Sequence, residues 1–188
     1  MKLWLLLAAA ALLVGCASSP PSKPHNLCAI FKEKPAWHRA ASKASRRWDT
    51  PVSVMMAIMF QESAFRHNAR PPRRWFLFVP LPRRSSAYGY PQAQDGTWNE
   101  YSQQAGSWLS SRSDFADSID FIGWYMDKTH KRNKVATSQA DLHYFAYHEG
   151  WTGYRRGSYK KKTWLKAVAA RVLRRSQTYQ KQLDQCRL

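Results

Sequence analysis

Glu62 is the residue whose type and spacing best suit acid–base chemistry. It follows the apolar run Val52–Phe60 and is in helical register with Met55, Ile58 and Met59. These spacings place its carboxyl group on an apolar helix face, near a C-terminus where the helix dipole disfavours negative charge. Burial and dipole both favour the neutral acid, so we expect a raised pKa, which suits a proton donor near neutral pH. If the helix instead ends at Phe60, the Glu62 side chain emerges into solvent.

The sequence contains none of the common motifs for other kinds of catalysis. The six His residues are scattered, and His143 and His148 are too far apart in register to share a helix face. There is no zinc motif, no Gly-rich phosphate loop and no Gly-x-Ser-x-Gly turn. We therefore expect a protein that uses neither a metal nor a cofactor.

The elements that would position Glu62 are predicted to be helices, so the fold class is mainly α. Thr50 is expected to cap the helix that carries Glu62, with Pro51 at the first helical position. This helix is apolar all round, as a buried central helix is. The last helix is expected to turn Trp164 and Val172 inward. Helical patterns also cover Pro35–Arg47, Asp95–Gln104, Asp114–Lys131, Ser138–His148 and Tyr159–Gln182.

The N-terminus has the pattern of an exported bacterial lipoprotein. The apolar run Leu3–Val14 is too short to span a bilayer but fits a signal peptide. The segment Leu13–Cys16 resembles the bacterial lipobox, in which the Cys is lipidated and becomes the first mature residue. We thus expect a signal peptide (1–15), lipidated Cys16 with a Pro/Ser tether (16–27) and one folded domain (28–188). The expected location is the periplasm, and Ala17 fits an anchor in the outer membrane.

Two further cysteines, Cys28 and Cys186, lie near the two ends of the expected domain. In an oxidising compartment such a pair is expected to form a disulfide, and two free thiols are the alternative. Neither suits a nucleophile, because both lie in terminal segments far from any motif.

Three short segments carry a family resemblance. Gln61-Glu62-Ser63-Ala64-Phe65 contains a Glu-Ser pair, Gly89-Tyr90-Pro91-Gln92 is similar to Gly-Leu-Met-Gln, and Ala146-Tyr147-His148-Glu149-Gly150 is similar to Ala-Tyr-Asn-Ala-Gly. In this order, they resemble the motifs of the family 1 lytic transglycosylases, the soluble-lytic-transglycosylase-type domain of the lysozyme-like superfamily. The resemblance covers about Trp48 to Tyr154. It implies a lysozyme-like helical domain with a long connecting loop or hairpin after the catalytic helix.

The resemblance also implies roles for individual residues. Glu62 would protonate the oxygen between N-acetylmuramic acid and N-acetylglucosamine, then accept a proton from the muramyl O6 hydroxyl as a 1,6-anhydro ring closes. Ser63 and Gln92 would hydrogen-bond the sugar, and Tyr147 would position Glu62 or the substrate. Plain packing is the alternative for each of these last three residues.

The chain departs from the family pattern in two motifs. Pro91 stands in place of Met and lacks a backbone donor. His148 and Glu149 replace Asn-Ala, and we expect both to contact substrate, with His148 donating a hydrogen bond where the amide would. A second carboxylate near Glu62 would allow hydrolysis, as in glycosidases that use two carboxylates. Alternatively, Glu149 ends a helix and meets the neighbouring Arg155 or Arg156.

Residues 70–84 form a Pro- and Arg-rich interruption that is longer than the family's usual connection. Its centre, Trp75–Leu81, is apolar and has an Arg pair on each side. Aromatic and basic residues together suit a membrane interface or a sugar-stacking flap over the groove. A loop folded back on the core is the third possibility.

The formal net charge of +18 on 188 residues would by itself suggest a nucleic-acid partner. Export changes the available polyanions to the carboxylates of peptidoglycan and anionic lipid headgroups, so no nucleic acid is expected. The expected partners of this monomer are peptidoglycan glycan strands and, through the N-terminal lipid, a membrane. A hydrolytic muramidase of the same fold and a wall-binding lipoprotein without turnover remain rival readings.

Overall fold

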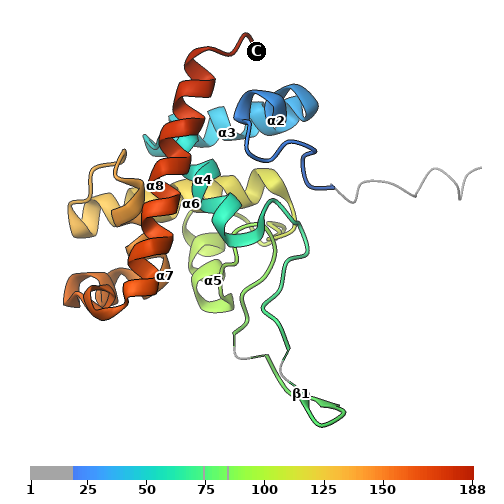
Figure 1. The fold of residues 1–188 in the computed structure, drawn as a ribbon, viewed down its shortest axis with the longest axis vertical. Helices are drawn as coiled ribbons and strands as arrows, with labels where there is room; N and C mark the ends of the chain where they lie inside the picture. Colours follow the sequence, from blue (N-terminus) through green and yellow to red (C-terminus); the bar gives the residue numbers. More distant parts are fainter. Residues whose placement is uncertain (1–18, 74, 84) are drawn as a thin grey trace, which may run out of the picture.

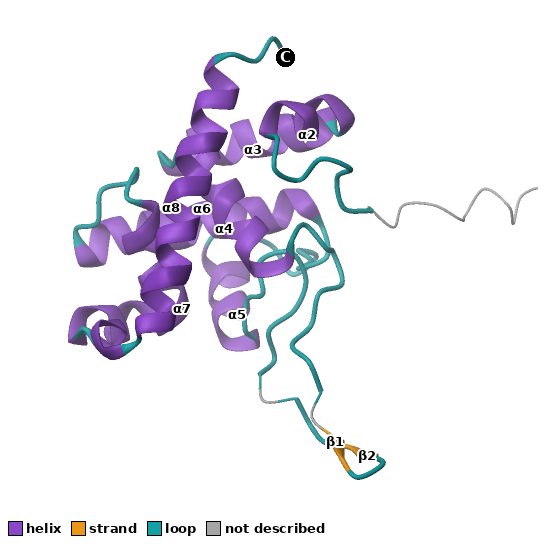
Figure 2. Ribbon diagram, viewed as in Figure 1, coloured by secondary structure: helices purple, strands orange, loops and turns teal. Residues whose placement is uncertain are grey.

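The computed structural model describes residues 19–73, 75–83 and 85–188, and this part of the chain is mainly helical, as predicted (Figures 1 and 2). The predicted signal peptide, the lipobox-like segment and Cys16 lie outside the described residues. None of the described helices is long and apolar enough to cross a membrane. The helices are α2 (Leu27–Glu33), α3 (Pro35–Trp48), α4 (Val52–Ser63), α5 (Asp95–Gln104), α6 (Phe115–Asn133), α7 (Ala140–Arg156) and α8 (Thr163–Asp184), with a 3₁₀ turn, η2 (Ser158–Lys161).

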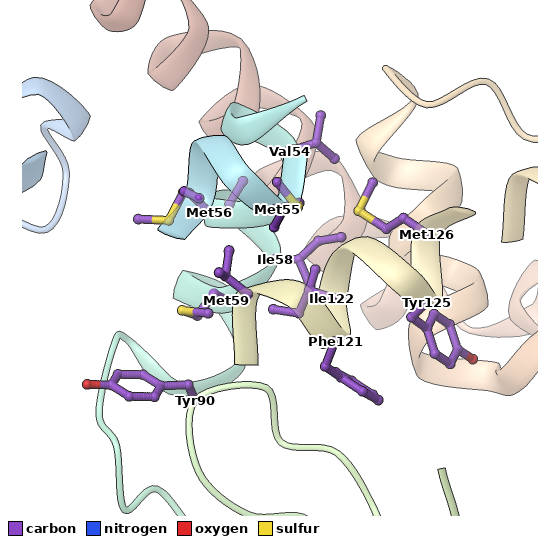
Figure 3. Packing of buried hydrophobic residues seen from close by; sticks show 14 of the residues in the cluster. Val54, Met55, Met56, Ile58, Met59, Tyr90, Phe121, Ile122, Tyr125 and Met126 are labelled. Carbon is purple, nitrogen blue, oxygen red and sulfur yellow. The ribbon is translucent and has the colours of Figure 1, made fainter. Parts of the chain in front are cut away.

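Helix α4 is the centre of the core, as its all-round apolar sequence predicts (Figure 3). It packs against α3, α6, α7 and α8, so every face of it meets another helix. It begins one residue later than predicted: Pro51 is the N-cap, and the Thr50 hydroxyl donates to the Trp48 carbonyl instead of capping the helix. It continues to Ser63, so Glu62 lies inside the helix and not beyond it.

Two of the remaining helices differ from the prediction in ways that affect the site. Helix α7 runs on past the predicted end at His148, through a break at Gly150 (φ 73°, ψ 161°) that only glycine adopts easily. Helix α8 turns Leu165 and Val172 inward, whereas Trp164 is 55% exposed. The inward prediction for Trp164 was wrong, because a residue next to Leu165 is rotated by about 100° from the buried stripe.

The N-terminal part of the described chain folds against the C-terminal helix. The expected disulfide joins Cys28 in α2 to Cys186, with Cα atoms 5.7 Å apart. Helix α2 was not predicted; Asn26 caps it by accepting a hydrogen bond from the Ala29 amide. Residues assigned to the tether also touch the domain, since the Tyr179 hydroxyl of α8 donates to the Pro24 carbonyl.

A long connection leads from α4 to α5, and it carries a small antiparallel hairpin of β1 (Trp75–Phe76) and β2 (Val79–Pro80). The sequence predicted a long loop or hairpin here. Figure 1 shows the hairpin projecting away from the helices, and neither strand packs on any of them. The alternative of a loop folded back on the core was therefore wrong.

Candidate active site

Glu62 lies on the last turn of α4, one residue before the helix ends, and its side chain is only partly exposed. The helix stops because Ala64 takes the left-handed conformation (φ 49°) while its amide donates to the Phe60 carbonyl. Burial raises the pKa of Glu62 to about 7, although a hydrogen bond from Tyr144 acts in the opposite direction. The direction agrees with the expectation from the apolar helix face.

Two tyrosines of α7 lie beside this carboxyl group. The Tyr144 phenol hydrogen-bonds the Glu62 carboxyl, and the Tyr147 hydroxyl donates to the Pro91 carbonyl at 2.6 Å. Burial and the charge of Glu62 raise the pKa of both phenols, so both stay protonated at neutral pH. The Tyr147 ring is further held edge-on against Tyr125, with centroids 5.0 Å apart. A neutral donor and a fixed aromatic wall therefore flank the acid.

The segment Gly89–Gln92 is fixed to the same site. Gly89 has φ 73°, and a Cβ there would lie 2.0 Å from the Arg112 carbonyl oxygen, so only glycine fits. The Gln92 amide nitrogen donates to the carbonyls of Gly89 and Ala69, each at 2.9 Å. Pro91 has no N–H to donate, but its carbonyl is the acceptor that holds Tyr147. The proline therefore keeps the backbone group that this contact uses.

A pocket of about 250 Å³ brings four of the five predicted substrate-binding residues together. These are Gln92, Tyr147, His148 and Glu149, with further walls from Ala93, Gln94, Thr97, Phe121, Tyr125 and Gly150. Glu62 is not among the lining residues. It adjoins the pocket through Tyr147, whose phenol responds to the Glu62 charge.

Ser63, the fifth of these residues, faces the protein interior. It is 1% exposed, and its hydroxyl donates to the Met59 carbonyl at 3.1 Å, one turn back along α4. Its own carbonyl accepts from the side chain of Arg66, also at 3.1 Å. The sugar contact expected for Ser63 stays a prediction, and in this structure the residue completes the end of the helix.

Glu149 is held in a polar clamp. Its side chain is 5% exposed and bonded to Lys162 at 2.7 Å, to His148 at 2.9 Å and to the Ser158 hydroxyl. Burial alone would raise its pKa, but these three hydrogen bonds together lower it to about 2. The sequence pointed to Arg155 or Arg156 as partners. The partner is Lys162 instead, because the chain breaks at Gly150 and turns back through η2.

Tyr144 and Lys162 are the two residues of the site that sequence reasoning missed. Tyr144 lies three residues before Tyr147, and this spacing, which puts both on one helix face, could have indicated it. No local pattern could have indicated Lys162, because its contact with Glu149 depends on the turn between α7 and α8. Among the described residues, no group of three or more His, Cys, Asp or Glu side chains is placed to hold a metal ion.

Comparison with protein families gives one assignment for nearly the whole chain. The family described as transglycosylase SLT domain matches residues 4–186. Comparison with curated proteins and with solved structures gave no match. The family match spans the central helix with Glu62, the Gln92 segment and the α7 tyrosines. The chain therefore belongs to the transglycosylase SLT domain family, lysozyme-like proteins of the lytic transglycosylase type that act on peptidoglycan.

Proposed function

We propose that the chain cleaves the bond between N-acetylmuramic acid and N-acetylglucosamine, with Glu62 as the single acid and base. The observation that carries this proposal is the carboxyl group at the end of α4, whose pKa burial raises to about 7. A group with this pKa is protonated often enough at neutral pH to donate a proton, and its anion is basic enough to recover one. The pocket beside Tyr147 offers a place for the adjoining sugars.

The reaction needs two proton transfers by the same carboxyl group. Neutral Glu62 gives its proton to the glycosidic oxygen, and the bond from that oxygen to C1 of the muramyl residue breaks. The positive charge that develops at C1 is stabilised by the substrate's own N-acetyl group. The Glu62 carboxylate then removes the proton from the O6 hydroxyl, and O6 bonds to C1 to close the 1,6-anhydro ring. Glu62 ends protonated, so the cycle returns to its starting state.

The state of Glu149 supports ring closure over hydrolysis. Glycosidases that admit water use a second carboxylate as base or nucleophile. Glu149, the candidate for that role, is ionised but tied to Lys162, His148 and Ser158. A carboxylate whose pKa is about 2 is a weak base and would have to break an ion pair to act as one.

The proposal is tested by release of glycan fragments from purified sacculi. Full-length protein is incubated with sacculi, and the wild type is compared with Glu62→Gln and with Glu33→Gln, a matched change on α2. We expect Glu62→Gln to lose at least about a thousandfold in rate, as expected when a lone acid is removed, and Glu33→Gln to keep full activity. Equal release by wild type and Glu62→Gln would remove Glu62 from the mechanism. Binding to sacculi without release by either would favour a wall-binding protein without turnover.

We also propose that the chain is exported to the periplasm and anchored to the outer membrane by a lipid on Cys16. The lipobox-like segment Leu13–Cys16 supports this, and so does the disulfide between Cys28 and Cys186, since such bonds persist in oxidising compartments. Metabolic labelling with a radioactive fatty acid tests the anchor. Wild type should carry label in the outer-membrane fraction and Cys16→Ser none, whereas label in both would exclude Cys16 as the site.

A further inference from the structure

The tip of the β1–β2 hairpin exposes three consecutive large apolar side chains. Phe76, Leu77 and Phe78, here called the hairpin tip, are 67%, 79% and 93% exposed. Apolar side chains gathered at one exposed place mark an interaction site more often than chance exposure does. The hairpin lines no part of the pocket beside Tyr147 and contacts none of the described helices.

The backbone conformation at the tip would suit another residue type better than the apolar residue found there. The Phe76↔Val79 pair is closed by a two-residue turn, in which Leu77 has φ 52°. Turns of this kind favour Gly, Asn or Asp, because other side chains are strained in the left-handed conformation. Leu77 lies in the turn between β1 and β2 and is exposed, and Figure 1 shows this hairpin projecting away from the helices. Neither packing within the chain nor turn geometry explains a leucine there.

A cluster of arginines lies at the base of the hairpin. Arg70, Arg73 and Arg83, here called the arginine collar, come from the two segments that lead into and out of it. The Arg83 side chain donates to the Pro71 carbonyl at 3.0 Å, which ties the two segments together. Desolvation and the charges of Arg73 and Arg70 lower the pKa of Arg83, so the Arg83 guanidinium is repelled by the other two. An anionic surface would relieve that repulsion.

We propose that the hairpin tip inserts into an anionic phospholipid bilayer while the arginine collar binds the headgroup phosphates. An apolar apex beyond a group of cations has the order of layers that a bilayer interface presents, in which hydrocarbon lies beyond the headgroup phosphates. A sugar flap would instead aim flat aromatic faces at the glycan pocket. The hairpin projects away from the helices in Figure 1, and none of its residues lines the pocket. The proposal does not depend on the proposed catalytic function.

The test asks whether the tip touches lipid when the whole chain is at a membrane. The photo-crosslinker p-benzoylphenylalanine is placed at position 78 of the full-length protein, and in a matched control at position 108. Trp108 is a suitable control because it is equally exposed, at 88%, and lies in the separate loop between α5 and α6. Each protein is irradiated with vesicles of phosphatidylglycerol and phosphatidylcholine, with phosphatidylcholine alone, and with purified sacculi.

We expect lipid adducts at position 78 at roughly ten times the yield at position 108, in anionic vesicles only. The triple change Arg70→Gln, Arg73→Gln, Arg83→Gln should reduce that yield about tenfold or more, because each cation near an anionic surface adds to binding. Equal lipid adducts at both positions would overturn the proposal, since the N-terminus alone would then bring the protein to the bilayer. Adducts at position 78 to glycan but not to lipid would overturn it in favour of a sugar flap.

Discussion

At the scale of single residues, Glu62 and Glu149 lie in opposite electrostatic surroundings. Burial raises the pKa of Glu62 to about 7, and its hydrogen-bond partner among the described residues is a neutral phenol, that of Tyr144. Burial also acts on Glu149, but a lysine, a histidine and a serine outweigh it and bring the pKa to about 2. Separated pKa values of this kind distinguish a proton donor from a structural anion.

Replacing Glu62 by Gln should stabilise the protein at high pH only. The folded pKa of about 7 lies above the reference value of 4.5, so stability falls as pH rises between these values and the loss is complete above about pH 7. We expect Glu62→Gln to unfold with a free energy roughly 2–3 kcal/mol larger at pH 8 and about equal at pH 4. Urea unfolding at both pH values measures this. If Glu62→Gln were less stable than wild type at pH 8, burial of the Glu62 carboxylate would not destabilise the folded protein.

Replacing Tyr144 by Phe should move the pH profile upward. The phenol hydrogen bond lowers the pKa of Glu62, so its loss raises that pKa further. The reaction begins with protonated Glu62, and we therefore expect the descending limb of kcat/KM to shift to higher pH. The pH dependence of fragment release from sacculi checks this, with Tyr154→Phe as the matched control. If the descending limb stayed at the same pH or moved to lower pH, Tyr144 would be excluded as the residue that lowers the pKa of Glu62.

Replacing Glu149 by Gln should lower stability and leave the anhydro type of product unchanged. The folded pKa of about 2 lies below 4.5, so the ion pair stabilises above about pH 4.5 and this stabilisation is lost as pH falls toward 2. We expect the free energy of unfolding of Glu149→Gln to be roughly 1–3 kcal/mol below that of wild type at pH 7, and the difference to be smaller at pH 3. Thermal unfolding at both pH values measures it. Loss of turnover with unchanged binding to sacculi in a folded Glu149→Gln protein would indicate a catalytic role for the second carboxylate.

At the scale of the elements, the segment before α5 depends on one glycine. A Cβ at Gly89 would meet the Arg112 carbonyl at 2.0 Å and would also be strained by φ 73°. Gly89→Ala should lower the unfolding free energy by roughly 2–4 kcal/mol and reduce turnover, since Gln92 and Pro91 follow directly. Gly96→Ala, in α5 with no atom within 4 Å of its Cβ, is the matched control and should be neutral or slightly stabilising. Similar losses of stability and turnover in both variants would contradict the claim that Gly89 fixes the segment before α5.

The elements also show how far the sequence could lead. The apolar run before Glu62 was enough to predict a central helix, because this depends on local periodicity, but it left open whether Glu62 lies on that helix or beyond its end. The Tyr144 hydrogen bond to Glu62 joins α4 to α7, and the Lys162 ion pair requires the break at Gly150. Such contacts are set by tertiary packing, which the pattern of one segment does not encode. Helix α2 was missed because seven residues are too few for a clear periodic signal.

At the scale of the whole molecule, the disulfide joins the first described helix, α2, to the segment that follows the last one, α8. The bond between Cys28 and Cys186 closes a sequence separation of 158 residues. In the chain-entropy model, a loop of this length contributes about 5 kcal/mol, at the upper end of the roughly 2–5 kcal/mol lost when a native disulfide is removed. We expect the double change Cys28→Ala and Cys186→Ala to lower the free energy of unfolding, measured in urea, by an amount in that range. The protein should keep its activity at low temperature. Unchanged stability would mean that the ends of the domain are held by packing alone.

The charge of the whole molecule also has a physical consequence. A formal net charge of +18 opposes the compact state through self-repulsion and attracts anionic surfaces over about one Debye length. Sacculi and anionic bilayers both present such surfaces. The charge therefore explains general adhesion to anionic surfaces. We assign the proposed cleavage to the site where Glu62 and Tyr147 lie side by side.

The mass of the released muropeptides tests most directly the claim that Glu62 acts alone and closes an anhydro ring. Wild type, Glu62→Gln and Glu149→Gln are each incubated with purified sacculi, and the soluble products are analysed by mass spectrometry. We predict muropeptides one water lighter than hydrolysis products from wild type and from Glu149→Gln, and no products from Glu62→Gln. Products with full reducing ends, lost when Glu149 is replaced, would contradict the claim and make the protein a two-carboxylate hydrolase.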